Sequence, residues 1–599
     1  MSADQTSIAL VTPEDVSKTT YDVVIVGTGV AGAIVAKQLS ERGKSVLMIE
    51  AGTSDSLSFE AFESYVESFQ VALNKNPNSP YPFNSSAPSP TDDTLGYFQE
   101  LGPFPISGSY TRITGGTTMH WEGKALRMLP EDFELKTKHG TGLDWPIGYD
   151  DLEPYYRKAE YELGVAGDTD EQKALGVPFP DGYVLPMQKI PPSYLDEQIR
   201  RKVDGATAQI DGESFELWLS TFPQARNGEP NPAYVAEDGG ALFEEFGAQC
   251  GGNASCVPIC PYEAKYDARR TLNTIAARQS VQLLGQAVVS KVEVDSETGQ
   301  VVAVQYKKYS DMSSPEHVVG SAKGRLFVLA CNAVENARLM LASDLPSSSG
   351  LIGRHLMDHP YLLAWGLMPE VTGTMRGPLC TSGIGSFRKG AFRKKQSAFA
   401  MDIHNDGWGW AGTGATDVLR DAVDNGLKYG QELRRELISR ISRQVLLAFM
   451  CEMPADPQNR VTVDPRYTDQ LGNLRPVMRF DVSDYCKQAI SYARDLSRQI
   501  FGMLGAEDHT VYDRSDPSYF EYQGEGYWIR GGNHFAGTHI MGAAKSSSVV
   551  DDRLRSWDHR NLYLVGGGSM PSIGSSNTTL TIAALSFRAS EQILEELGG

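Results

Sequence analysis

Three cysteines lie close together near the middle of the chain, in a Cys-x5-Cys-x3-Cys arrangement formed by Cys250, Cys256 and Cys260. Three thiolates on a glycine-containing loop can ligate an iron–sulfur cluster, whose ligands often follow one another at short spacing. A structural zinc ion needs a fourth ligand, and none is evident within the loop. Free or disulfide-bonded thiols would also fit the pattern, although seven cysteines is an odd number for a disulfide framework.

A second group of residues, near the N-terminus, has the spacing of a dinucleotide-binding turn. Gly27, Gly29 and Gly32 form a Gly-x-Gly-x-x-Gly fingerprint, and Glu50 follows at the end of the next expected strand. The first glycine allows a tight bend, the second lets the backbone approach a pyrophosphate, and the third lets the helix pack on the strand. The following helix N-terminus favours phosphate, and an acid at this distance bonds ribose hydroxyls. The spacing therefore predicts dinucleotide binding, with a purely structural glycine turn as the alternative.

The C-terminal end of the chain favours a flavin over a nicotinamide cofactor. Residues 561–568 read as a strand that runs into a triple-glycine turn, and a helix is expected from about Thr579. Such a turn brings a second helix N-terminus to the same cofactor, where its dipole can act on the isoalloxazine ring.

The surrounding sequence predicts the elements that position these residues. A strand, a helix and a strand are expected at 23–26, 31–42 and 45–50, which is the opening unit of a doubly wound sheet. Residues 285–330 alternate apolar and polar side chains, as antiparallel strands do. Helical spacing covers 417–450 and 483–504. We therefore predict an α/β fold, with a Rossmann-like FAD-binding domain interleaved with an α+β substrate domain built on an antiparallel sheet.

Several blocks resemble, in the same order, the glucose-methanol-choline (GMC) oxidoreductase family. Besides the N-terminal glycine turn, they are Gly115–Trp121, Gly353–His359 and the C-terminal block. The resemblance is strongest to the flavoprotein subunits of bacterial glucose, gluconate and fructose dehydrogenases, and pyranose oxidases are more distant. It implies an FAD-dependent enzyme that oxidises a CH–OH group of a sugar or glycoside. It also implies that Gly115, Gly116 and Gly567 contact the cofactor.

The resemblance assigns a catalytic pair as well. Alcohol oxidation needs a base for the hydroxyl proton while a hydride leaves the carbon for flavin N5, and imidazole titrates near neutrality. Carried over from the family block, His534 is the base and Asn577 orients the substrate oxygen. His539 falls at a more structural position behind His534, and His355 and His359 belong to a block that we interpret as structural, near the flavin.

His120 stands four positions after Gly116. In several GMC oxidases a histidine with this spacing is covalently attached to the 8-methyl carbon of the flavin, which raises the potential of the flavin. Two alternatives stay open for His120: such a covalent bond, or a packed or hydrogen-bonded histidine beside the flavin. We favour the second.

The resemblance also implies which cluster the cysteine loop would hold. Glucose and fructose dehydrogenase flavoproteins hold a [3Fe–4S] cluster on a very similar stretch, and Cys250, Cys256 and Cys260 match all three ligands. The resemblance thus implies a sugar dehydrogenase that passes electrons to a cytochrome c or another one-electron carrier, with a small subunit as a further partner. The alternatives are an oxygen-using pyranose or glycoside oxidase without a functional cluster, and a lyase on the same scaffold.

The segments are expected to alternate along the chain. They are a flexible tail (1–20), a first FAD-binding part (21–180), an insertion with the cysteine loop (181–270), a second FAD-binding part (271–365), a substrate-binding domain (366–525) and a C-terminal FAD-binding part with the catalytic pair (526–599).

Composition excludes some classes of function. A formal charge of −20 argues against a nucleic-acid partner, which requires clustered Lys and Arg. No stretch approaches the roughly 20 apolar residues of a membrane span. The first twenty residues lack the basic start and apolar centre of a secretory signal. We therefore expect the cytoplasm, with the periplasm as the alternative if a partner subunit carries the signal.

Overall fold

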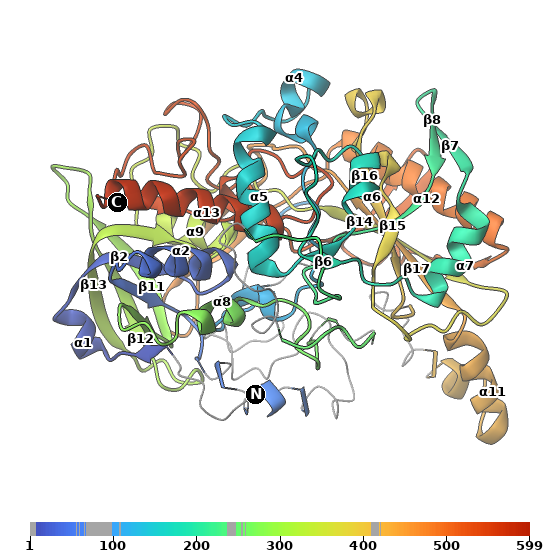
Figure 1. The fold of residues 1–599 in the computed structure, drawn as a ribbon, viewed down its shortest axis with the longest axis horizontal. Helices are drawn as coiled ribbons and strands as arrows, with labels where there is room; N and C mark the ends of the chain where they lie inside the picture. The colour runs from blue at the N-terminus through green and yellow to red at the C-terminus, as the bar shows by residue number, and fades with distance from the viewer. Residues whose placement is uncertain are drawn as a thin grey trace.

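A computed structural model gives the fold (Figure 1). The structure describes residues 8–598 except for 55–56, 59, 61, 65, 68–96, 98, 107–109, 237–246, 253–255, 258, 409–417 and 420.

An eight-stranded sheet carries the N-terminal fingerprint. Its order is β1-β10-β3-β2-β13-β12-β11, and β24 pairs with β13 outside this path. The strands are β1 (Ala9–Leu10), β10 (Val281–Leu284), β3 (Val46–Ile49), β2 (Thr20–Val26), β13 (Val318–Leu329), β12 (Val301–Lys308), β11 (Ala287–Val294) and β24 (Leu562–Leu564).

The long strand β13 belongs to two ladders. Its first part pairs antiparallel with β12, and its second part pairs parallel with β2 and, over its last three residues, with β24. The parallel ladder continues through β3, β10 and β1. The antiparallel strands expected within 285–330 are therefore confirmed, and they extend a parallel dinucleotide-binding sheet.

Helices cover the parallel part of this sheet. In Figure 1, α13 (Thr579–Glu596) runs beside α2 (Val30–Glu41), and α5 (Tyr149–Leu163) crosses α13. Helix α9 (Ala333–Ala342) follows β13 directly and packs against β11. Helices α2 and α13, which come from opposite ends of the chain, thus lie side by side. Each follows a glycine turn, so both turns meet at one edge of the sheet.

A second, seven-stranded sheet is antiparallel throughout and lies on the other side of the molecule (Figure 1). Its order is β20-β14-β17-β16-β15-β9, with β23 paired to β14. Helix α12 (Asp484–Leu504) packs on β14 and β17. The strands are β20 (Glu507–Asp508), β14 (Pro360–Leu367), β17 (Gln444–Cys451), β16 (Phe399–His404), β15 (Ser382–Ile384), β9 (Leu219–Thr221) and β23 (Arg530–Gly531). The predicted fold class, an interleaved pair of α/β and α+β domains, is confirmed.

Further elements lie outside these two sheets. They are β4 (Gln99–Glu100), α4 (Leu135–His139), β5 (Ala166–Gly167), α6 (Thr169–Ala174), β6 (Met187–Gln188), α7 (Tyr194–Val203), β7 (Ala206–Ile210), β8 (Glu213–Leu217), α8 (Ala268–Thr274), α11 (Gly430–Ile441), β18 (Arg460–Thr468), β19 (Leu474–Arg479), β21 (Tyr519–Tyr522) and β22 (Glu525–Trp528).

The segment at 1–20 is not a flexible tail over the residues that the structure describes. Strand β1 pairs with β10 at the edge of the sheet, and α1 (Pro13–Ser17) is capped by the Thr12 hydroxyl and the Asp15 carboxylate. Ile8 and Val16 are buried. The prediction was wrong there because two apolar side chains and a capping box anchor a stretch whose composition is polar. The other segment boundaries stay predictions.

The continuous helix expected over 417–450 is also wrong. In the described part of this range, α11 ends at Ile441 and β17 begins at Gln444. All eight residues of β17 are buried between neighbouring strands. A central strand is apolar on both faces, so its sequence is a short continuous apolar run. Hydrophobic periodicity cannot distinguish such a run from a segment of a buried helix.

None of the helices in the described part of the chain combines the length and the apolar character needed to cross a membrane.

Candidate active site

The N-terminal turn has the geometry that its three glycines predict. Gly27 has φ +100°, and a Cβ on Gly32 would lie 2.1 Å from the Gly27 carbonyl oxygen. A Cβ on Gly29 would meet nothing within 4 Å, because this residue faces a cavity. Gly27 and Gly32 are therefore required by the chain itself, whereas Gly29 leaves room for something that the chain does not supply.

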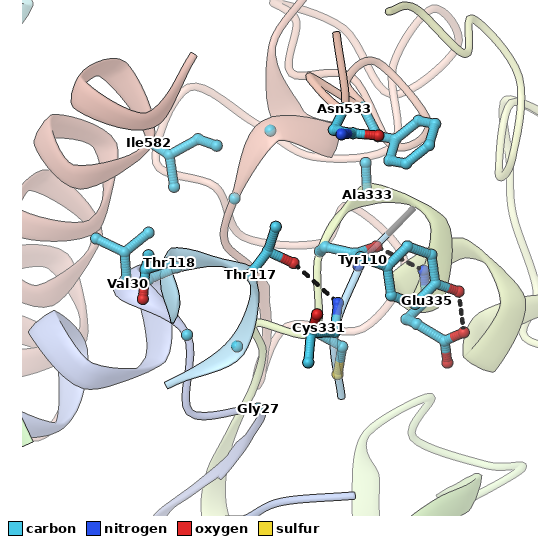
Figure 2. A pocket seen from close by; sticks show the side chains of 18 of the residues that line it. Gly27, Val30, Tyr110, Thr117, Thr118, Cys331, Ala333, Glu335, Asn533 and Ile582 are labelled. Carbon is cyan, nitrogen blue, oxygen red and sulfur yellow. Dashed lines mark hydrogen bonds between the residues drawn. The ribbon is translucent and has the colours of Figure 1, made fainter. Parts of the chain in front are cut away.

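The cavity at this turn is lined by segments from both ends of the chain. Figure 2 shows Val30, Thr117, Cys331 and Ile582 around it, although they come from four distant stretches of sequence. Backbone N–H groups at the start of α2 border the same space, which suits the phosphates of a dinucleotide.

Glu50 lies at the end of β3 and borders the cavity. Its carboxylate accepts hydrogen bonds from the Thr28 amide at 3.1 Å, the Thr28 hydroxyl at 2.5 Å and the Gly52 amide at 3.0 Å. Burial raises its pKa above the usual value. The carboxylate thus fixes the glycine turn and borders the part of the cavity where a ribose would lie.

The Gly115-Gly116 pair brings a second wall to the turn. Both glycines have positive φ, at +96° and +58°, and a Cβ on Gly116 would lie 3.2 Å from the Gly29 Cα. His120 follows in the same wall and lines the cavity. Burial lowers the pKa of His120 to about 3, so its imidazole is neutral. Its Nε2 has no hydrogen-bond partner among the described residues, which leaves both alternatives for this histidine open.

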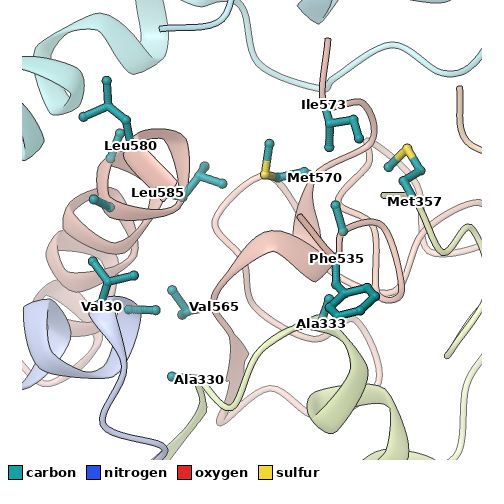
Figure 3. Packing of buried hydrophobic residues seen from close by; sticks show 14 of the residues in the cluster. Val30, Ala330, Ala333, Met357, Phe535, Val565, Met570, Ile573, Leu580 and Leu585 are labelled. Atoms are coloured by element: carbon teal, nitrogen blue, oxygen red, sulfur yellow. The ribbon is translucent and has the colours of Figure 1, made fainter. Parts of the chain in front are cut away.

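The C-terminal turn closes the cavity from the opposite side. A Cβ on Gly567 would lie 2.6 Å from the Phe535 carbonyl oxygen, so glycine is required for this close approach. Figure 3 shows the apolar side chains of Val30, Val565 and Leu585, which belong to one buried cluster. This packing holds α2, β24 and α13 against one another and fixes the two glycine turns relative to each other.

The predicted catalytic pair meets in this cavity. The His534 Nε2 atom lies 3.2 Å from the Asn577 Nδ2 atom, and both residues line the wall. His539 is fully buried elsewhere, between the Asn336 amide and the Ser569 hydroxyl, each at 3.2 Å. The structure therefore places His534, and not His539, beside Asn577.

Asp358 and His359 hold His534 from behind. The Asp358 carboxylate accepts the backbone N–H groups of His359 and His534, both at 2.8 Å. The His359 Nδ1 atom lies 2.9 Å from the His534 Nδ1 atom. The sequence pattern led us to interpret His359 as structural and did not reveal this contact. A polar Asp-His pair directly before the apolar strand β14 was the signal that could have revealed it.

Charged side chains line the cavity next to the catalytic pair. The Lys124 ammonium contacts the Asp402 carboxylate at 2.5 Å and the Glu122 carboxylate at 2.9 Å. Tyr361 and Arg530 line the same region. The sequence motifs did not point to this group, which offers several donors and acceptors to a substrate rich in hydroxyl groups.

Two buried cations contact Cys256 of the cysteine loop. The Arg226 guanidinium donates to the Cys256 sulfur at 3.3 Å. The Lys265 ammonium donates to the carbonyls of Cys256, at 2.8 Å, and of Trp121. Burial lowers the pKa of Lys265 to about 8. Val257, directly after Cys256, lines the cavity that contains His534 and Asn577, so the loop forms part of its wall.

None of the seven cysteines forms a disulfide, which removes that alternative for the loop. Arg226, at the Cys256 sulfur, and Lys265, at the Cys256 carbonyl, are cations that would offset the negative charge of an iron–sulfur cluster held by the thiols of the loop.

This arrangement of two glycine turns, a neutral imidazole and an amide around one long cavity defines an FAD-dependent oxidoreductase that acts on CH–OH groups. The chain belongs to the GMC oxidoreductase family, whose N- and C-terminal domains match residues 242–361 and 455–586. It is 30% identical to the fructose dehydrogenase large subunit of Gluconobacter japonicus, over 96% of this chain and 98% of that protein.

Two further relatives extend the comparison. Paromamine 6'-oxidase of Streptomyces fradiae is 26% identical, over 96% of this chain and 92% of that protein. The structure of formate oxidase from Aspergillus oryzae superposes with a TM-score of 0.61 at 13% identity, covering 97% of this chain and 99% of that chain. Proteins named as dehydrogenases and as oxidases thus resemble this chain over nearly its whole length.

Substitution of Gly29 tests the cofactor site separately from the fold. Gly29→Ala should weaken FAD binding by at least about tenfold, or about 1.4 kcal/mol, because the methyl group projects into the space beside the phosphate-binding amides. The added Cβ meets no atom within 4 Å, so the protein should fold normally. FAD content after purification and titration of apoprotein with FAD measure the effect.

The matched control is Gly502→Ala in α12, where an added Cβ also meets nothing within 4 Å. This variant should retain the FAD content of the wild type. If Gly29→Ala binds FAD as tightly as the control, the pyrophosphate does not approach the backbone at this turn.

Proposed function

We propose that this protein is an FAD-dependent sugar or glycoside dehydrogenase that also holds a [3Fe–4S] cluster on Cys250, Cys256 and Cys260. One observation carries the proposal: Val257 of the cysteine loop lines the same cavity as His534 and Asn577. A loop that ligates a one-electron centre beside the flavin gives electrons an exit, whereas an oxidase needs none.

The side chains of the cavity support a division of roles. When bound here, FAD accepts the hydride that leaves the carbinol carbon. His534 Nε2 takes the hydroxyl proton, and the Asn577 amide N–H, which stays neutral at every working pH, donates to the substrate oxygen. Glu122 accepts hydrogen bonds from other hydroxyls, while Lys124 and Arg530 donate to them.

Several features support a dehydrogenase over an oxidase. The relative with 30% identity is the large subunit of a fructose dehydrogenase, and large subunits belong to complexes. When bound, a [3Fe–4S] cluster supplies one-electron transfer to a carrier such as a cytochrome c. Arg226 would stabilise the thiolate of Cys256, while Lys265 holds the carbonyl of the same residue. A small subunit is the expected further partner.

The decisive experiment is chemical analysis of the purified protein. We expect about three iron atoms and four acid-labile sulfides per chain, with absorption beyond that of flavin alone. After anaerobic reduction by sugar, exposure to air should reoxidise the flavin slowly and without stoichiometric peroxide.

The alternative function is an oxygen-using sugar or glycoside oxidase with no functional cluster. The 26% identity to paromamine 6'-oxidase over nearly the whole chain favours it. Absence of iron, together with fast reoxidation and one peroxide for each reduced flavin, would establish this alternative and refute the dehydrogenase.

A further inference from the structure

We propose that His359 is a positioning residue that fixes the tautomer of His534, so that the bare Nε2 nitrogen of His534 faces the substrate. The inference deepens the proposed function and rests on the role of His534 as the base. It is carried by a continuous row of hydrogen bonds from Gly574 through His359 and His534 to Asn577.

The row begins at the Gly574 carbonyl oxygen, which can only accept a hydrogen bond. The His359 Nε2 atom lies 3.0 Å from the Gly574 carbonyl oxygen, so this nitrogen carries the hydrogen. A neutral imidazole has one N–H group, which makes His359 Nδ1 an acceptor. His359 is fully buried, and burial lowers its pKa to about 4, so it is neutral at working pH. The neighbouring Asp358 carboxylate accepts backbone amides and leaves both ring nitrogens of His359 alone.

The tautomer of His534 follows from the tautomer of His359. The two Nδ1 atoms are 2.9 Å apart, and two acceptors do not form a hydrogen bond, so His534 Nδ1 must donate its hydrogen to His359. The rings meet edge to face at 86°, with centroids 4.9 Å apart. His534 Nε2 is therefore left with a lone pair in the cavity, where the Asn577 amide N–H donates to it at 3.2 Å.

This arrangement sets the direction of proton transfer. A hydroxyl group that enters between His534 and Asn577 replaces the Asn577 N–H at the Nε2 lone pair and can give its proton to Nε2, while the hydrogen on Nδ1 stays bonded to His359. With the opposite tautomer, Nε2–H and the substrate O–H would both be donors, and no base would be present. His359 thus does with a neutral ring what a carboxylate does in hydrolytic triads, where the wrong tautomer costs about 10⁴-fold.

The charged groups around His534 do not supply an alternative partner. Lys124 and Glu122 lie on the cavity side and act on His534 through their charges, with no hydrogen bond to either ring nitrogen among the described contacts. Asp358 bonds the His534 backbone amide and not its ring. Within the described part of the chain, His359 is the group bonded to Nδ1 of His534.

Two substitutions of similar size separate tautomer control from packing. His359→Asn places an amide oxygen near the former Nδ1 position, so this variant keeps an acceptor for His534. Its limiting rate of FAD reduction by sugar should stay within about tenfold of the wild-type rate. Leu cannot accept a hydrogen bond, and His359→Leu should lose about 10²–10⁴-fold in the limiting rate of FAD reduction. The sugar concentration at half-maximal rate and the FAD content should change little in either variant.

Small-molecule rescue covers the case in which His359→Leu does not fold. In His359→Ala, added imidazole should restore reduction, because it accepts at one nitrogen and donates at the other. Pyrrole has the same ring size and a donor but no acceptor nitrogen, and it should restore nothing. Equal rates in the Asn and Leu variants, or equal rescue by both rings, would overturn the inference.

The His534→Ala variant, measured alongside, separates this inference from the proposed function. A slow His534→Ala variant beside a wild-type rate in His359→Leu overturns the role of His359 alone. A wild-type rate in His534→Ala removes the base itself, and with it both the inference and the assigned catalytic pair.

Discussion

Replacing His534 by alanine is expected to slow the reduction of bound FAD by substrate about 10²–10⁴-fold, the usual contribution of a general base. His534 Nε2 faces the cavity beside Asn577, and no other described histidine ring is hydrogen-bonded to that amide. FAD should stay bound, because the phosphate-binding turns lie elsewhere along the cavity. Anaerobic stopped-flow reduction with sugar, followed by flavin absorbance, measures the effect.

The control for this variant is His317→Ala, which replaces an exposed histidine far along the chain from the site. It should reduce FAD at the wild-type rate. Rapid reduction in His534→Ala would eliminate His534 as the base.

The assignment of His534 as the base also determines how the rate of FAD reduction depends on pH. Burial, with the nearby His359 and Lys124, holds the pKa of His534 well below its usual value of about 6.5. A base acts in its neutral form, so a lowered pKa keeps it active as the pH falls. The limiting rate of FAD reduction should thus stay constant down through pH 6.5 and decline only at more acidic pH. An acid limb centred at or above that value would contradict the buried environment of this imidazole.

Cys256→Ser should separate the two halves of the reaction. Under the proposed function, this substitution removes one of three cluster ligands and should abolish cluster binding, because even outer partners of a metal site contribute about 10–100-fold to affinity. Iron content should fall to near zero, and turnover with a one-electron acceptor should drop by at least that factor. Reduction of FAD by sugar should remain near the wild-type rate, because His534 and Asn577 are untouched.

The matched control is Cys486→Ser, a buried cysteine in α12 whose thiol is bonded to the Glu452 carbonyl. Iron content and acceptor turnover should be unchanged in this variant. Unchanged turnover in Cys256→Ser, with one-electron acceptors, would show that the loop has no part in electron transfer.

The parts of the fold that the sequence predicts best are those in which a single physical requirement determines the residue type. Only glycine fits at Gly27, where φ is positive, and at Gly32, where a Cβ would collide with a carbonyl. The strand-helix-strand unit around them was therefore predictable. So were the helix at Asp484–Leu504 and the antiparallel extension of the sheet, because their apolar periods are clear.

The parts that could not be predicted depend on contacts between distant segments. The buried strand at Gln444–Cys451 has no distinguishing period, and β1 is held by a strand about 270 residues away in sequence. His359 acquires its position beside His534 only when residues 358–359 and 534 are folded together. The pairing of Lys124 with Asp402 likewise brings together residues that are 278 positions apart in sequence.

Strand β13 is flanked by β2, from the start of the chain, and by β24, from its last forty residues. Wall residues of the cavity, including Gly566, Gly567 and Ile582, come from that late segment. The cavity therefore lacks one wall until the segment that carries β24 and α13 folds against β13. FAD binding should therefore depend on the folding of this C-terminal segment against the N-terminal glycine turn.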